Sequence, residues 1–212
     1  NAGSGVLKTF NLTVGNPVCS FSPSLPSPGF VVTSDSHYGN KIGDFNNDGH
    51  QDYVTCSRLT SSSIFRSINI YFGDGMGGFI LNTTFNFTSI QEQSNKLHDL
   101  IVDDFTGDGF LDVAVTYGNC NNASGRFIRI FKGDGAGSLV AVYKSEGFST
   151  FYDCYTDEMP LLKSADINND GIKDIVIGTS NENPGSGSSY SLFSRYFIGT
   201  GDGTFNTGSA MS

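Results

Sequence analysis

The sequence predicts an all-β protein built from three copies of a four-stranded antiparallel unit, and three observations favour this class. An acidic nine-residue motif recurs about every 60 residues, starting at Asp44, Asp104 and Asp166. Short β-branched and apolar runs surround each motif, as expected of strands. Glycine is abundant, with 27 residues, and no long amphipathic helical pattern is present, which favours many strands joined by turns.

The acidic motif reads DFNNDGHQD at residues 44–52, DFTGDGFLD at 104–112 and DINNDGIKD at 166–174. We name these the first, second and third acidic loops. Oxygen-bearing side chains at alternate positions can wrap a hard cation such as Ca²⁺, and the sixth-position glycine permits the positive φ of a sharp turn. The sequence therefore predicts three calcium sites. The expected ligands are side-chain oxygens and, at the seventh position, a main-chain carbonyl: Asp44, Asn46, Asp48, His50 and Asp52; Asp104, Thr106, Asp108, Phe110 and Asp112; Asp166, Asn168, Asp170, Ile172 and Asp174.

Two other interpretations of the acidic motif fit the sequence less well. An EF-hand requires a bidentate glutamate at position twelve between two helices, but Thr55, Val115 and Ile177 stand there and strand-like runs follow. Asp-Gly dipeptides also form ordinary hairpin turns. Three loops in the same phase, each with five ligand positions filled, favour calcium over a simple turn.

The expected elements follow in order from the hydrophobic runs and turns. Four antiparallel strands in about 60 residues make one blade of a β-propeller. The calcium loop joins the first two strands of each blade, and a GDG turn joins the last two. The expected strands span 40–45, 52–56, 66–73 and 79–85; 96–105, 112–117, 126–133 and 138–144; 161–167, 174–178, 194–200 and 204–210. The expected division of residues 1–212 is a fourth-type strand and Pro/Ser-rich connector at 1–37, then blades at 38–83, 98–144 and 160–210.

The order of acidic loop, apolar strand, variable loop, apolar strand and GDGxGxF turn resembles the FG-GAP or VCBS-type repeat of integrin α-subunit-like β-propellers. The resemblance covers essentially the whole chain. It implies calcium on the ligands named above, with the acidic loops on one face of the propeller. It also implies that the loops joining second to third strands, and blade to blade, lie on the opposite face.

The turn GDGMGG at residues 73–78 satisfies the dinucleotide-binding pattern G-x-G-x-x-G by chance. A dinucleotide site needs a helix after this motif, whereas the strand-like run FILNTTF follows here. The related turns GDGAGS and GTGDGT occupy the same place in the other units. The motif therefore predicts a hairpin turn and no nucleotide site.

Glycosylation sequons and cysteines favour a secreted or cell-surface protein. The sequons lie at Asn11, Asn82, Asn86 and Asn122. Four cysteines allow three disulfide connectivities and lack zinc-like spacing. The blade register puts all four opposite the acidic loops, and we expect the pairs Cys19–Cys56 and Cys120–Cys154. A first residue that is not Met favours a processed or excised segment.

Charge and motifs exclude several functions. The formal net charge is −9, and the acidic loops hold three aspartates each, which disfavours nucleic acid or an anionic membrane as a partner. No apolar run approaches the roughly 18 residues of a membrane span. His37, His50 and His98 have no nucleophile motif beside them, G-x-S-x-G is absent, and Asp103 is expected to support the second acidic loop. We therefore expect a protein that is not an enzyme.

Two non-catalytic functions remain. As a binding module, the loops opposite the acidic loops would recognise an extracellular protein or glycan, with Arg126, Tyr152 and Tyr155 as contacts. As a structural subunit, the blades would assemble with other copies into an extracellular coat or fibre. Three blades do not easily close a ring. We therefore expect either a longer propeller or contacts between chains, with the strand-like residues 1–14 available to a neighbouring sheet.

Overall fold

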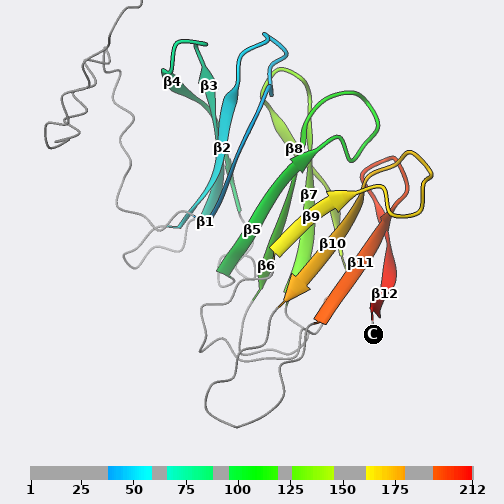
Figure 1. The fold of residues 1–212 in the computed structure, drawn as a ribbon. Coiled ribbons are helices and arrows are strands. Elements are labelled where there is room, and N and C mark those ends of the chain that lie inside the picture. Colours follow the sequence, from blue (N-terminus) through cyan, green and yellow to red (C-terminus); the bar gives the residue numbers. More distant parts are fainter. Residues whose placement is uncertain are drawn as a thin grey trace, which may run out of the picture.

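The computed structural model describes residues 38–58, 66–87, 96–118, 126–145, 161–179 and 193–211. These residues form twelve strands and no helix. The strands make three four-stranded antiparallel sheets, which lie one after another along the chain (Figure 1). Within the same ranges, a membrane-spanning helix is not found. The expected all-β class and the four-stranded repeating unit are confirmed.

Each sheet takes its strands in chain order, so that every neighbour in sequence is a neighbour in the sheet. The observed strands match the expected runs to within two residues. The first strand of each sheet ends two residues earlier than expected, before the acidic loop begins. The first sheet contains β1 (Tyr38–Gly43), β2 (Asp52–Arg58), β3 (Arg66–Gly73) and β4 (Phe79–Asn86). The second contains β5 (Lys96–Asp103), β6 (Asp112–Gly118), β7 (Arg126–Gly133) and β8 (Leu139–Lys144). The third contains β9 (Leu161–Ala165), β10 (Asp174–Thr179), β11 (Phe193–Gly199) and β12 (Phe205–Met211).

The order of the strands decides which connections meet at one end of each sheet. In an antiparallel sheet of order one to four, the first and third connections share an end. The acidic loop between the first two strands therefore lies beside the GDG turn between the last two, as Figure 1 shows for all three sheets. The sequence placed the acidic loops at one end but did not assign the GDG turns to it.

The sheets pack face to face through two hydrophobic cores. Strand β1 contacts β5, and β5 contacts β9, so the first strands lie next to each other. Directly paired residues form a row across each sheet that faces the preceding sheet. In the second sheet this row is Val102, Val113, Phe131 and Ala141, which pack with Val54, Ile68 and Ile70 of the first sheet. In the third sheet Ile175 and Phe197 occupy the same positions and pack with Ile128 and Ile130 of the second.

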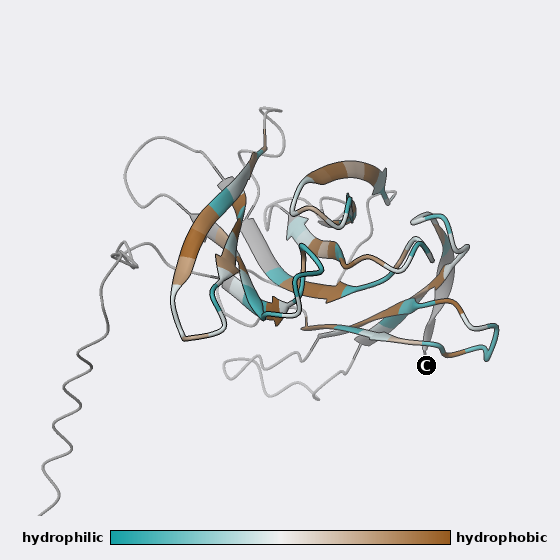
Figure 2. Cartoon of the chain, turned by 90° about the horizontal axis from the view of Figure 1, so that it is seen from above, coloured by the Kyte–Doolittle hydropathy of each residue, from teal (hydrophilic) through white to brown (hydrophobic). Residues whose placement is uncertain are grey.

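The first sheet carries the same row, but no sheet covers it within the described residues. The row consists of Ile42, Tyr53, Tyr71 and Leu81, paired directly across the strands. Ile42 is 62 % exposed and Leu81 is 51 % exposed. Figure 2 shows these strands in the setting of all three sheets, with hydrophobic strand segments joined by hydrophilic loops. We name this row the outward face of the first sheet.

Cys56 lies inside the first core. The residue is 2 % exposed, its thiol forms no disulfide with a described residue, and burial raises its pKa. Cys19, Cys120 and Cys154 lie outside the described residues, so both disulfides stay predictions.

Two of the four sequons are described. Asn82 and Asn86 are exposed on β4, as an acceptor of a glycan must be. Asn11 and Asn122 lie outside the described residues, as do Tyr152 and Tyr155 and the connector at 1–37. Arg126 begins β7.

Candidate metal centre

The three acidic loops adopt one backbone conformation. The sixth-position glycines Gly49, Gly109 and Gly171 have φ of 85°, 86° and 86°. The fourth position is also left-handed, with φ of 57° at Asn47, 70° at Gly107 and 62° at Asn169. Because only glycine, asparagine and aspartate adopt this conformation at low cost, the loop sequences select it locally.

The first carboxylate of each loop accepts hydrogen bonds from the loop's own backbone. Asp44 accepts from the amides of Asp48 (3.2 Å) and Gly49 (2.9 Å). Asp166 accepts from Asp170 (3.1 Å) and Gly171 (2.9 Å). In the second loop Asp104 accepts from three amides, those of Gly107 (2.7 Å), Asp108 (3.2 Å) and Gly109 (2.8 Å). This carboxylate organises the turn at the point where the strand stops.

The third and fifth positions contact each other in the first and third loops. The side-chain amide of Asn46 donates to Asp48 Oδ2 at 2.8 Å, and Asn168 donates to Asp170 Oδ2 at 2.8 Å. The other oxygen of each aspartate accepts from the backbone amide of the seventh residue, His50 or Ile172. Side chains at positions one, three and five are thus gathered around one short turn.

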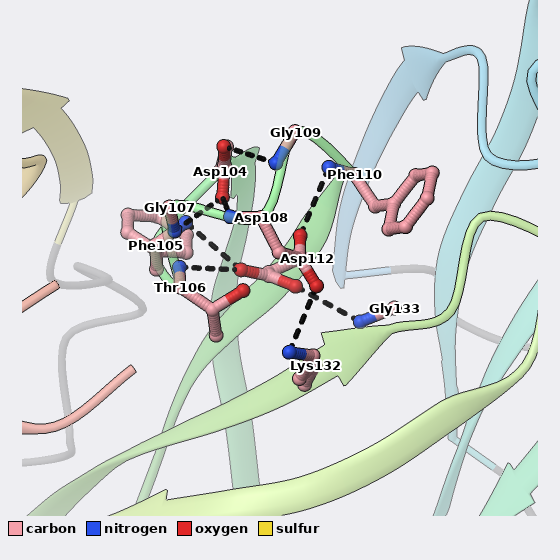
Figure 3. A network of polar contacts seen from close by, with 10 residues as sticks. All are labelled: Asp104, Phe105, Thr106, Gly107, Asp108, Gly109, Phe110, Asp112, Lys132 and Gly133. Atoms are coloured by element: carbon pink, nitrogen blue, oxygen red, sulfur yellow. Dashed lines mark hydrogen bonds and ion pairs between the residues drawn. The ribbon is translucent and has the colours of Figure 1, made fainter. Parts of the chain in front are cut away.

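The second loop satisfies its fifth carboxylate differently, as Figure 3 shows. Asp108 Oδ2 lies 2.8 Å from the Lys132 ammonium at the end of β7. This ion pair lowers the pKa of Asp108 and raises that of Lys132. Thr106 replaces the asparagine, and its hydroxyl oxygen is buried without a hydrogen bond of good geometry. A buried hydroxyl in this position leaves an oxygen ligand available at the centre of the loop.

The ninth carboxylate is buried between its acidic loop and the neighbouring GDG turn. Asp52, Asp112 and Asp174 are all completely buried. Asp112 Oδ2 accepts from the amides of Phe105 and Thr106 at 2.9 Å, and Oδ1 accepts from Gly133 at 2.9 Å (Figure 3). Desolvation raises the pKa of Asp112, against the opposing effect of these amides.

The corresponding bonds in the other loops join the same two connections. Asp52 accepts from Phe45 (2.7 Å) and Gly73 (3.0 Å), and Asp174 accepts from Ile167 (2.8 Å) and Gly199 (2.8 Å). Each ninth aspartate therefore ties the acidic loop to the glycine that opens the GDG turn.

The GDG turns of the second and third sheets also reach the acidic loop of the preceding sheet, and a Cβ on Gly135 would approach Asn47 Nδ2 to 3.0 Å. The amide of Gly203 donates to the carbonyl of Phe105 at 3.1 Å. A Cβ on Gly203 would approach Thr106 to 2.9 Å, so the close contact requires glycine there. The exposure of the second-position side chains agrees with this contact. Phe45 and Phe105 are 3 % and 1 % exposed, whereas Ile167 of the third loop is 42 % exposed.

The family model described as FG-GAP-like repeat matches residues 44–115 and, again, residues 104–177. Each match begins at the first aspartate of an acidic loop and ends in the strand that follows the next one. The chain belongs to the FG-GAP-like repeat family. The resemblance inferred from the loops and turns is therefore confirmed. A search of curated proteins found no match.

In this FG-GAP-like repeat protein all fifteen expected ligand residues lie in the acidic loops. Their side chains are not all gathered around one point in each loop. In the described ranges no group of three or more carboxylate, imidazole or thiol side chains is arranged to hold a metal ion. Positions one, three and five share the turn, while the ninth aspartate binds backbone amides. The donors are nevertheless all oxygen, and a carboxylate has about four acceptor sites, so lone pairs remain for a cation. The residue types therefore fit calcium.

One interaction at these FG-GAP-like loops was expected from the sequence, and three others were not. Asp103 does support the second loop, because its Oδ1 accepts from the amide of Asp104 at 3.0 Å. Its other oxygen accepts from Ser164 Oγ at 2.8 Å and lies 3.5 Å from Lys173 Nζ, both in the third repeat. The contact of Lys132 and the role of the GDG glycine amides were also missed. Only the place of Lys132 directly before Gly133 marks it in the sequence.

Proposed function

We propose that this protein is a calcium-stabilised β-propeller-type module for adhesion or ligand binding outside the cell, without catalytic activity. The observation that carries the calcium proposal is the repetition of one turn with the same oxygen donors in all three acidic loops. Calcium would be held by positions one, three, five and nine and the carbonyl at position seven. When bound, it would cross-link each turn and balance its three carboxylates.

Ligand recognition is proposed for the end of the sheets opposite the acidic loops. By strand order, the strand ends that the connections between β2 and β3, β6 and β7, and β10 and β11 join lie at that end, while the connections themselves lie outside the described residues. Loops that differ in sequence on a rigid scaffold are suited to binding a protein or glycan. The sequons support a secreted or cell-surface location, since N-glycans are added on the secretory route.

Direct calcium binding tests the proposal. We expect isothermal titration of the chelator-treated chain to show three calcium ions per molecule. Asp44→Asn together with Asp48→Asn should remove one ion and leave two. Replacing the exposed residue Asp202 of a GDG turn by asparagine serves as the control and should leave three. A stoichiometry of zero would reject the calcium proposal.

The ligand-binding function needs a separate test. A screen of glycans and extracellular proteins, with and without calcium, provides it.

The outward face of the first sheet favours a second candidate, assembly with other copies. The equivalent rows of the second and third sheets are covered by a neighbouring sheet, whereas no described sheet lies over the row of the first sheet, where Ile42 and Leu81 are 62 % and 51 % exposed. A sheet of a second copy would bury this row in the same way. Sedimentation should then show concentration-dependent association that Tyr71→Lys weakens at least about tenfold, the effect of losing one anchor of roughly 1.4 kcal/mol. A chain that stays monomeric at high concentration would contradict assembly.

A further inference from the structure

The second acidic loop differs from the other two at one atom. In each loop, Oδ2 of the fifth-position aspartate accepts one hydrogen bond from a side chain. The donors are Asn46 Nδ2 to Asp48 at 2.8 Å, Asn168 Nδ2 to Asp170 at 2.8 Å and Lys132 Nζ to Asp108 at 2.8 Å. The distance is the same in all three, but only the second donor carries a charge.

The change of donor follows from two differences in sequence between the second repeat and the other two. Thr106 stands where the other loops have asparagine, and a threonine has no amide with which to reach the fifth aspartate. Lys132 stands where the other sheets have Phe72 and Ile198, directly before the glycine of the GDG turn. The lysine of β7 thus supplies the donor that the loop itself lacks.

The second loop is also held by contacts outside itself. Asp103, adjacent to the loop, binds Ser164 on β9 and Lys173 in the third acidic loop. The backbone of Phe105 accepts from Gly203 in the turn between β11 and β12. These contacts hold the second loop in place, and the ammonium of Lys132 offsets part of its negative charge, without a metal ion.

A fixed positive charge next to a calcium ligand opposes calcium. When calcium binds, the Lys132 ammonium must either leave Asp108 or remain close to the divalent ion. Both reduce the affinity of the loop for calcium. We propose that Lys132 is a built-in counter-ion that makes the second acidic loop the weakest of the three calcium sites and keeps it folded when calcium is low. This inference rests on the proposed calcium function.

The amides of Gly49, Gly109 and Gly171 report on the loops separately. Each donates to the first aspartate of its own loop, at 2.9, 2.8 and 2.9 Å. Calcium titration of the ¹⁵N-labelled full chain by NMR therefore yields one binding curve for each loop. In the natural chain we expect Gly109 to respond at the highest calcium concentration.

Lys132→Gln supplies a neutral amide donor in place of the ammonium, as asparagine does in the other loops. We expect it to shift the midpoint for Gly109 about three- to tenfold toward lower calcium, since the lost ion pair and its repulsion of calcium act in the same direction. The midpoints for Gly49 and Gly171 should not change. Lys132→Met is the second variant, in case the glutamine is poorly accommodated, and its spectrum reports directly whether the fold is kept.

Lys163→Gln is the matched control, because Lys163 is an exposed lysine on β9 and its loss changes the net charge equally. An equal shift in this control would overturn a specific role for Lys132. Three glycines that respond with one midpoint, unaffected by Lys132→Gln, would overturn the inference while leaving the calcium function intact. No response from any of the three glycines would overturn the calcium function and this inference with it.

Discussion

Replacing Asp112 with alanine is expected to destabilise the protein by about 3–5 kcal/mol even when calcium has been chelated. The side chain is completely buried, and its two oxygens accept from the amides of Phe105, Thr106 and Gly133. Alanine leaves these three donors without acceptors, and each unsatisfied buried group costs about 1–3 kcal/mol. The second acidic loop would also lose its connection to the GDG turn.

Urea denaturation in excess chelator measures this effect apart from any loss of calcium. Asp134→Ala is the matched control, because Asp134 also accepts two backbone amides, from Ala136 and Ser138 at 2.8 Å, but it is exposed in its turn. Water can replace the lost acceptor there, so we expect a cost of about 1 kcal/mol. Equal losses in the two variants would show that burial of Asp112 contributes nothing. A loss for Asp112→Ala that appears only with calcium present would assign its role to the metal.

Removal of calcium is expected to lower the melting temperature by about 15 °C or more. A ligand present at 100 times its Kd stabilises by about 2.7 kcal/mol per site, and three proposed sites would contribute about 8 kcal/mol. In a chain of this length each kcal/mol corresponds to roughly 2–4 °C. Without the ion, the carboxylates of the first and third loops would repel one another, and their sheets would lose their cross-linked ends.

Differential scanning calorimetry in saturating calcium and in excess chelator measures the shift. Asp44→Asn combined with Asp166→Asn should reduce the shift to less than a third, because only the second loop, the weakest of the three proposed sites, remains. Magnesium at the same concentration is the control for ionic strength and should restore little, since it demands a tighter octahedral site. An unchanged melting temperature after chelation would contradict the calcium proposal.

The sequence alone was enough to predict the strands, the acidic loops and the GDG turns. All three depend on short-range physics. Apolar and β-branched runs favour strands, and a left-handed backbone requires Gly or Asn at positions such as Asn47 and Gly49. The repeat spacing then made a four-stranded unit the simplest arrangement, and the three observed four-stranded sheets confirm it. The calcium, the glycans and the disulfides stay predictions, because the described residues do not test them.

Only the tertiary structure decided what the ninth aspartates and Lys132 do. Asp52 and Asp112 each bind a glycine amide 21 residues away, and Asp174 binds one 25 residues away. Such contacts depend on strand register and on the direction of a side chain, which a local pattern does not contain. For the same reason the sequence did not show that Ile42 is exposed whereas the equivalent Val102 packs against the first core. Burial is a property of the neighbouring sheet, and identical patterns are buried or exposed according to what lies beside them.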